Sequence, residues 1–250
     1  MMLGVESADR TQASHAEEGL SAVTGEKTAA DLFSRLATEL HDSGGVCETV
    51  QAVVEFALLA LGCSHAGVAL ATKGSPEVPA TTDPVVEEIY RWQMVRGVGP
   101  LVESIRERRT ILVRDTAAET RWPAWCAKVL SLGVHSVLDI PLTTASGTVG
   151  VLGLYSASAD AFDADDEAIA QILARHASVA VASARTEENL ARAVDSRRLV
   201  GEAMGILMER YGVDGDRAFA ILRRYSQVTN TKLREVAAQL IDTRRLPPHP

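Results

Sequence analysis

The sequence predicts an α+β domain followed by a long helix and a small all-α module. Three observations support this fold class. Helical and strand-like segments are interleaved up to residue 162, no strand pattern returns after Asp163, and short amphipathic segments fill residues 200–246. We therefore divide the chain into a disordered tail (1–27), an α+β domain (28–184), a three-helix module (185–246) joined through a connecting helix (about 163–200), and a short tail (247–250).

The composition is that of a folded protein in a reducing compartment. Hydrophobic residues make up 46% of the chain and charged residues 23%. Cys47, Cys63 and Cys126 form no CxxC pair and no Cys/His cluster, so we expect neither a disulfide framework nor a metal site, and we expect all three thiols to be buried. The first 27 residues lack the basic and apolar regions of a signal peptide, and no apolar run could span a bilayer. We expect a cytoplasmic protein that does not contact a membrane.

The α+β domain is predicted to open with two helices. Residues 28–42 and 46–61 each repeat apolar positions at helical spacing. A Ser-Gly-Gly sequence at 43–45 separates them, and Gly62 ends the second. A strand over 65–71 and a turn at 73–76 follow.

Helices and strands then alternate. Asp83 and Pro84 predict the N-cap and first position of a helix to residue 94, and Gly99-Pro100 opens another to residue 109. Further segments are a strand (110–114), a helix (122–132) and two strands (136–142 and 148–155) around a turn. The closing hairpin favours an antiparallel sheet.

The segment after Asp163 is helical in pattern as far as Val200, without glycine or proline. A heptad places Leu190 at one seam position and Val179 at the other, but Ser183 and Thr186 weaken the middle of the seam. A parallel dimeric coiled coil and one long helix packed on its own domains are both compatible with this pattern.

The last module has three amphipathic helices. The first carries an apolar stripe from Val200 to Tyr211 and ends at Gly212. Asp214 or Asp216 can cap the second helix, and Thr229 or Asn230 the third.

Charge is divided unevenly between the two ends of the chain. The net charge is −8, but residues 189–250 carry 11 Lys and Arg against 7 Asp and Glu, which leaves −12 on residues 1–188. This asymmetry suggests a polyanionic partner for the C-terminal end only, although charge alone is also typical of a solvated helix face.

Basic and polar side chains off the buried stripes give the candidate binding residues. Basic groups contact phosphates, and Ser, Thr or Asn near helix ends can donate to backbone or base edges. The set is Arg198, Arg217, Arg223, Arg224, Ser226, Thr229, Asn230, Lys232 and Arg234.

Residues 32–184 resemble a GAF domain. The resemblance rests on GVGPLVESIRERRTILVRD (97–115), ETRWPAW (119–125), LGVHSVLDIPL (132–142) and GTVGVLGLYSASADAF (147–162). It implies an antiparallel sheet with packed helices, and a domain that binds a small molecule such as a cyclic nucleotide, tetrapyrrole or haem, or that only dimerises. The sequence selects no ligand or cofactor. No cysteine is placed for covalent attachment of a tetrapyrrole, and His65, His135 and His176 lack the spacing of metal or haem ligands. The larger aromatic residues suit a core as well as a pocket: Tyr90, Trp92, Trp122 and Trp125.

Residues 200–241, VGEAMGILMERYGVDGDRAFAILRRYSQVTNTKLREVAAQLI, closely resemble an ANTAR domain. Met204 departs from the family pattern, since many members have Lys there. The resemblance implies an actinobacterial-type GAF and ANTAR regulator that recognises tandem small stem-loops in nascent RNA and alters transcription termination or downstream expression. Hairpin loops expose unstacked bases, and paired stem-loops suit a homodimer because two sites on one scaffold gain avidity.

The sequence leaves two other functions as alternatives. A DNA-binding regulator is compatible with three helices of this length, but no glycine-bearing tight turn precedes a long recognition helix. Some GAF domains resemble free methionine sulfoxide reductases, which work through cysteines, yet Cys47 and Cys63 lie in apolar helical sequence. We found no paired carboxylates, nucleophile elbow or phosphate-binding loop, so we do not expect an enzyme.

Overall fold

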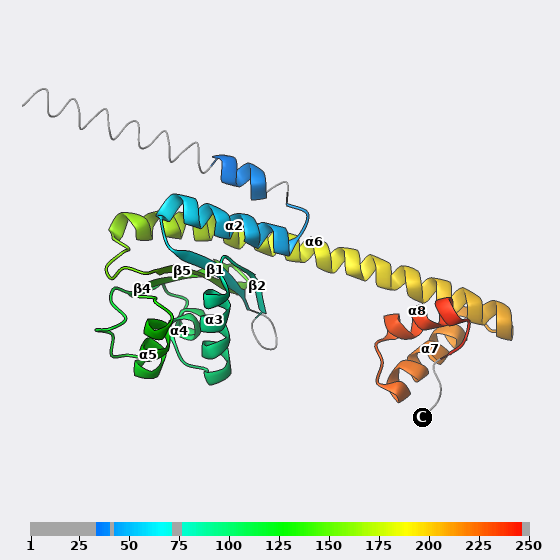
Figure 1. Ribbon diagram of the computed structural model, residues 1–250. Helices are drawn as coiled ribbons and strands as arrows, with labels where there is room; N and C mark the ends of the chain where they lie inside the picture. The colour runs from blue at the N-terminus through cyan, green and yellow to red at the C-terminus, as the bar shows by residue number, and fades with distance from the viewer. Residues whose placement is uncertain (1–33, 41–42, 72–76, 247–250) are drawn as a thin grey trace, which may run out of the picture. The chain divides into compact units, whose positions relative to one another are not determined.

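The computed structural model describes residues 34–40, 43–71 and 77–246 (Figure 1). These residues fall into two units, which divide between Ala184 and Arg185. The two tails predicted at 1–27 and 247–250 and the turn predicted at 73–76 lie outside the described residues. Of the helix predicted over 28–42, residues 34–40 are described, and they are helical.

The first unit is built on one five-stranded antiparallel sheet with the order β2-β1-β5-β4-β3. Its strands are β1 (His65–Leu70), β2 (Glu77–Thr81), β3 (Ile111–Val113), β4 (Ser136–Thr144) and β5 (Gly147–Ser156). β5 lies at the centre, where Gly153 pairs with Gly67 of β1 and with Asp139 of β4. The predicted α+β class with an antiparallel sheet is confirmed.

Strand β2 was not predicted from the sequence. Its five residues, EVPAT, contain Pro79, which cannot donate a hydrogen bond to a neighbouring strand and argues against a strand in a sheet interior. β2 lies at the edge of the sheet and pairs only with β1, a position that tolerates a proline.

Helices cover both faces of this sheet. Figure 1 shows α2 (Val46–Leu61) and the first part of α6 on one face, and α3 (Pro84–Arg96), α4 (Pro100–Glu107) and α5 (Pro123–Ser131) on the other. Successive side chains of β5 point to opposite faces of the sheet and so contribute to both cores. Leu152 and Leu154 pack with α2 and α6, whereas Val151 and Tyr155 pack with α3 and α5.

Local signals in the sequence set the ends of these helices. The Asp83 side chain accepts a hydrogen bond from the Val85 amide at 2.7 Å, and Pro84 occupies the first helical position of α3, both as predicted. Gly62 follows α2 with φ of 57°, a conformation that glycine adopts without the steric cost of a side chain.

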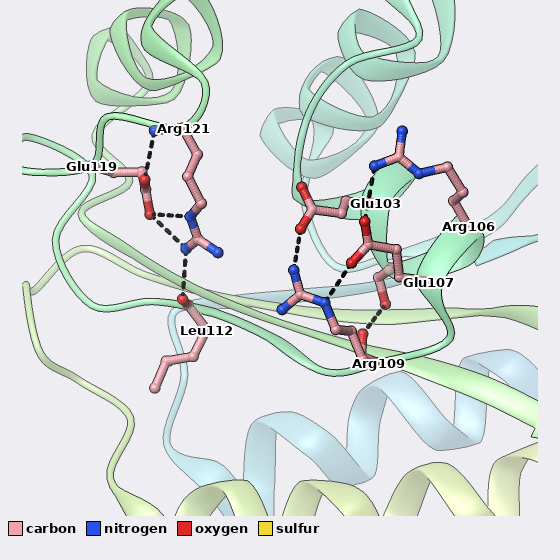
Figure 2. Close-up of polar contacts among 8 residues, drawn as sticks. Glu103, Arg106, Glu107, Arg109, Leu112, Glu119 and Arg121 are labelled. Carbon is pink, nitrogen blue, oxygen red and sulfur yellow. Dashed lines mark hydrogen bonds and ion pairs between the residues drawn. The ribbon is translucent and has the colours of Figure 1, made fainter.

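Two arginines fix the loops on either side of β3 (Figure 2). Arg109 pairs with Glu103 and, at 2.6 Å, with Glu107. Arg121 pairs with Glu119 at 2.6 Å and donates to the Leu112 carbonyl at 3.1 Å. The hydrogen bond from Arg121 is the main cause of the lowered pKa of Glu119. Both arginines find their partners within the same domain, so we infer that these contacts stabilise the fold.

All regular elements among the described residues of the second unit are helices: the end of α6 (Ala164–Tyr211), α7 (Gly215–Thr229) and α8 (Leu233–Thr243). Its core is aliphatic and consists of Ala203, Leu207, Ala218, Leu222, Val236, Ala237 and Leu240. Gly212, with φ of 62°, follows α6, and the Asp214 side chain caps α7 by accepting from the Arg217 amide at 2.8 Å. Both ends agree with the sequence prediction.

The predicted cap of the third helix is wrong. Neither Thr229 nor Asn230 caps α8; its N-cap position is Lys232, which makes no side-chain capping bond. Asn230 instead ends α7 in the left-handed conformation, with φ of 50°. Asparagine is favoured in both places because its short polar side chain suits helix starts and also tolerates positive φ.

Candidate nucleic-acid interface

Helix α7 forms the framework of the candidate interface. Ala218 and Leu222 are fully buried, and Ile221 and Tyr225 pack half-buried against the same core. The side chains between these positions therefore face outward, as the 3.6-residue period of an amphipathic helix requires. The candidate residues of α7 lie on these outward positions or at its C-terminal end.

Five of the predicted cations are exposed and unpaired. Arg217, Arg223 and Arg224 lie on α7, Lys232 lies at the N-cap of α8, and Arg234 lies in the first turn of α8. None of them forms an ion pair with a carboxylate among the described residues. Their charges remain available to an external anion.

Arg198 lies elsewhere. It is on α6, five residues before the buried Ala203, which at about 100° per residue places it on the helix face away from the core. Its guanidinium pairs with Glu202 at 2.7 Å and lies 3.9 Å from Asp195. The structure therefore does not group Arg198 with the cations of α7 and α8.

The hydroxyl groups of Ser226 and Thr229 have partners within the module. Ser226 Oγ donates to the Thr231 carbonyl at 2.7 Å, and Thr229 Oγ1 donates to the Tyr225 carbonyl at 2.7 Å. The Ser226 carbonyl accepts the backbone N–H groups of Asn230 and Thr231. These two side chains shape the turn between α7 and α8 rather than project from it.

Asn230 both shapes the turn and exposes its side chain. Its backbone adopts the left-handed conformation that closes α7, while its side chain is exposed. The amide is therefore the polar group at this turn that both points outward and is held on a fixed backbone.

The sequence did not single out Phe219 as a binding residue. Its side chain is 40% exposed, although it directly follows the buried Ala218. A helical projection could have shown this, since a step of about 100° moves Phe219 off the buried stripe. Arg210 also has an unforeseen role, since its Nη1 donates to the Arg244 carbonyl at 2.6 Å and joins the end of α6 to the end of α8.

The first unit contains a buried polar centre on the sheet face covered by α3. Asp139 is fully buried, and neither of its carboxylate oxygens has a hydrogen-bond partner among the described residues. Burial raises the pKa of Asp139 from 3.8 to about 8. A β-carbon on Gly153 would lie 2.5 Å from the Tyr90 hydroxyl oxygen and 2.8 Å from Asp139 Oδ1, so glycine is required to admit these oxygens.

The aromatic residues divide between core and surface. Tyr90, Trp122 and Trp125 are buried. Trp92 lines an open depression of about 560 Å³ between α3 and α5 and stacks with Arg96, whose guanidinium carbon lies 4.6 Å from a ring centroid. The aromatic residues thus do not line one common pocket.

The cysteine prediction is correct at two positions and wrong at the third. Cys63 and Cys126 are buried, and burial is the main cause of a raised thiol pKa in both, to about 11 for Cys63. Cys47 is exposed, because it lies on the outer side of α2, away from its buried neighbours Val46 and Val50. Among the described residues, no group of three His, Cys, Asp or Glu side chains could hold a metal ion. No described helix is long and apolar enough to cross a bilayer.

The chain thus combines an α+β unit that contains a buried polar centre with a helical unit that carries unpaired cations. The sequence model of the GAF domain family matches residues 46–182, and that of the ANTAR domain matches residues 188–241. The chain therefore belongs to the GAF domain family and carries an ANTAR domain, which is the module of RNA-binding antitermination regulators, after a GAF domain, which is a sensory module.

Solved structures support the first fold. The GAF domain of a phosphoenolpyruvate-protein phosphotransferase from Acinetobacter aligns with a TM-score of 0.51 at 15% identity, over 65% of this chain and 98% of its own. The corresponding Coxiella burnetii domain gives 0.50 at 17% identity, over 64% and 96%. A free methionine-R-sulfoxide reductase from Neisseria meningitidis gives 0.51 at 17% identity, over 64% and 91%. Identities this low establish the fold alone. No curated protein sequence matches the chain.

Proposed function

We propose that the protein is a cytoplasmic regulator that binds paired RNA stem-loops through its ANTAR domain and thereby controls transcription termination or expression of the downstream gene. The GAF domain serves as the input or dimerisation module. The observation that carries this proposal is the group of five exposed, unpaired cations on α7 and at the start of α8, in a chain whose net charge is −8.

The chemistry of these side chains suits an RNA hairpin. Arginine and lysine neutralise phosphates, and a helical surface can reach bases only where they are splayed out of a duplex, because the major groove of A-form RNA is too narrow for side-chain readout. Hairpin loops supply unpaired bases next to a phosphate-rich stem. The turn between α7 and α8 presents Asn230 and Lys232 on a backbone fixed by Ser226, and Arg223 lies on α7 seven residues before Asn230.

Exposed apolar side chains on α6 support a homodimer. In the second unit, Leu190 and Val194 are 66% and 56% exposed and lie four residues apart, so they share a helix face. In the first unit, Val179, the partner position of the predicted heptad, is 69% exposed. Two modules on one dimer could hold two adjacent stem-loops, and the second contact would gain from effective concentration.

The first experiment is a binding selection with the full chain. The probes are an RNA pool with two adjacent hairpins of randomised loops, a matched pool with one hairpin, and a pool of duplex DNA. We expect enrichment of two-hairpin RNA. Enrichment of duplex DNA instead would favour the DNA-binding alternative and contradict the proposal.

Variants test whether the named surface is used. Arg223→Ala should weaken binding to the enriched RNA, since one phosphate or base contact is lost. Arg192→Ala is the matched control, because this arginine of the same unit is also exposed but pairs with Glu188 at 3.6 Å. Equal affinities for Arg223→Ala and the wild type would reject this surface. Transcription across a terminator placed after the enriched RNA then shows whether binding changes readthrough.

The cysteine environments favour a regulator over a thiol enzyme. A nucleophilic cysteine needs a lowered pKa and solvent access, whereas the pKa of both buried thiols is raised. Cys47 is accessible and lies on the outer side of α2. Methionine sulfoxide reduction that is lost on Cys47→Ser would restore the enzyme alternative.

A further inference from the structure

Helix α7 presents two different outward flanks. Taking the buried Ala218 as the reference and about 100° per residue, Phe219 and Arg223 lie about 100° and 140° around the helix. Arg217 and Arg224 lie about 260° and 240° around it, on the opposite side of the buried stripe. The cations of α7 therefore point in two directions, with Arg223 about 100° from its neighbour Arg224.

The first flank pairs an aromatic ring with a planar cation. Phe219 is 40% exposed, whereas Phe56 and Phe162 are buried, so it differs from the other phenylalanines among the described residues. A single exposed apolar side chain is ordinary on a protein surface. Here, however, the unpaired Arg223 follows one helical turn later, and both a ring and a guanidinium plane can stack on an unpaired base.

Asn230 completes this flank. It is the C-cap of α7, seven residues after Arg223, and lies at the C-terminal end of this helix. Its left-handed backbone is held by the hydrogen bond to the Ser226 carbonyl, and its exposed amide offers both donors and an acceptor. An amide that both donates and accepts hydrogen bonds can recognise the edge of a base. A contact to a phosphate needs only a donor.

The second flank carries positive charge but has neither an aromatic ring nor an exposed amide at its end. Arg217 and Arg224 are seven residues apart, about 10 Å along the axis, and the apolar residue beside them is Val228. Two cations spaced along a helix suit successive points on a nucleic-acid backbone.

We infer that α7 divides RNA recognition between its flanks: Phe219, Arg223 and Asn230 read unpaired loop bases, while Arg217 and Arg224 bind stem phosphates. Phe219 is the stacking residue of this surface. The inference rests on the proposed function, because it requires a hairpin RNA on the ANTAR domain.

Conservative variants separate the two roles in the full chain. Phe219→Leu keeps an apolar side chain but removes the ring, and Phe219→Trp keeps a ring. Arg223→Lys keeps the charge but removes the planar fork, and Arg217→Lys and Arg224→Lys are the matched controls on the other flank. Affinity is measured for the selected two-hairpin RNA, for versions with substituted loop bases, and over a series of salt concentrations.

We expect Phe219→Leu to lower the preference for the selected loop by about tenfold, since stacking contributes about 1–3 kcal/mol per base, while Phe219→Trp retains it. Arg223→Lys should also lower this preference. Arg217→Lys and Arg224→Lys should leave it unchanged, and Arg217→Ala should weaken all hairpins alike and reduce the salt slope by about one.

Two failures are distinguishable. If the wild type binds hairpin RNA but Phe219→Leu keeps its full loop preference, the division between flanks is wrong and the proposed function stands. If the wild type enriches no hairpin RNA, both are wrong. Circular dichroism of each variant confirms that α7 is intact, and a variant with lost helicity is replaced by Phe219→Met.

Discussion

Ser226 donates a hydrogen bond through its hydroxyl to the carbonyl oxygen of Thr231, at 2.7 Å, and this bond closes the turn between α7 and α8. The hydroxyl predicted to touch RNA therefore has a partner inside the module. The turn fixes Asn230 and positions Lys232 at the start of α8. Ser226 acts on the binding surface by shaping it.

Ser226→Ala should lower the stability of the ANTAR domain by about 1 kcal/mol, the typical net contribution of one hydrogen bond. RNA affinity should fall only slightly, through the less rigid turn between α7 and α8. Thermal denaturation followed by circular dichroism measures the first effect and hairpin titration the second. A large affinity loss at unchanged stability would show that the hydroxyl contacts RNA after all.

Substitutions of Asn230 should separate backbone from side chain. Asn230→Gly keeps the left-handed conformation at φ of 50°, so we expect a folded domain with reduced loop preference. Asn230→Ala keeps a β-carbon but loses the short polar side chain that lets asparagine tolerate this conformation, and should cost about 1 kcal/mol of stability. Urea denaturation and loop-base discrimination are measured for both. Full discrimination by Asn230→Gly would exclude base recognition by the amide.

Asp139 should make the GAF domain less stable as the pH rises. Its pKa is about 8 in the folded domain and near 3.8 when solvated, so the folded state holds a proton that the unfolded state has released. The stability contributed by this group is fully present below about pH 3.8 and is lost progressively as the pH rises towards 8.

Asp139→Asn removes this titration and should become stabilising relative to the wild type as the pH rises from 5 to 8. Urea denaturation followed by tryptophan fluorescence reports on the GAF domain alone, because Trp92, Trp122 and Trp125 all lie in it. Parallel pH profiles for the two proteins would contradict a protonated Asp139.

The three thiols should differ in alkylation rate. Cys47 is exposed, whereas burial raises the pKa of Cys63 to about 11 and also raises that of Cys126. Iodoacetamide at pH 8 should therefore modify Cys47 first, as peptide mass spectrometry can show, and Cys47→Ser should abolish the fast phase. Fast modification of Cys126 in the folded protein would indicate an activated thiol.

Much of the fold was predictable because its determinants are local. Gly62, the pair Asp83 and Pro84, and Asp214 each fix a helix end through their own conformational preference. β2 was missed because Pro79 disfavours a strand unless it lies at a sheet edge, and strand order depends on contacts distant in sequence.

The candidate site was predictable in composition but not in arrangement. The pairing of Arg198 with Glu202 could have been expected from their spacing of four. The bond from Ser226 to Thr231 could not, since it depends on the left-handed conformation at Asn230, and asparagine equally suits a helix start. The exposure of Phe219 was also within reach of the sequence, since a helical projection places Phe219 about 100° from the buried Ala218.

The most direct test of the account is the dissociation constant of the full-length protein for the selected two-hairpin RNA, measured for the wild type, the double variant Arg223→Ala/Arg224→Ala and the control Arg192→Ala. We predict that the double variant binds at least about tenfold more weakly, because two unpaired cations are lost, while the control matches the wild type. Equal affinity in all three proteins would show that the exposed cations of α7 do not bind RNA.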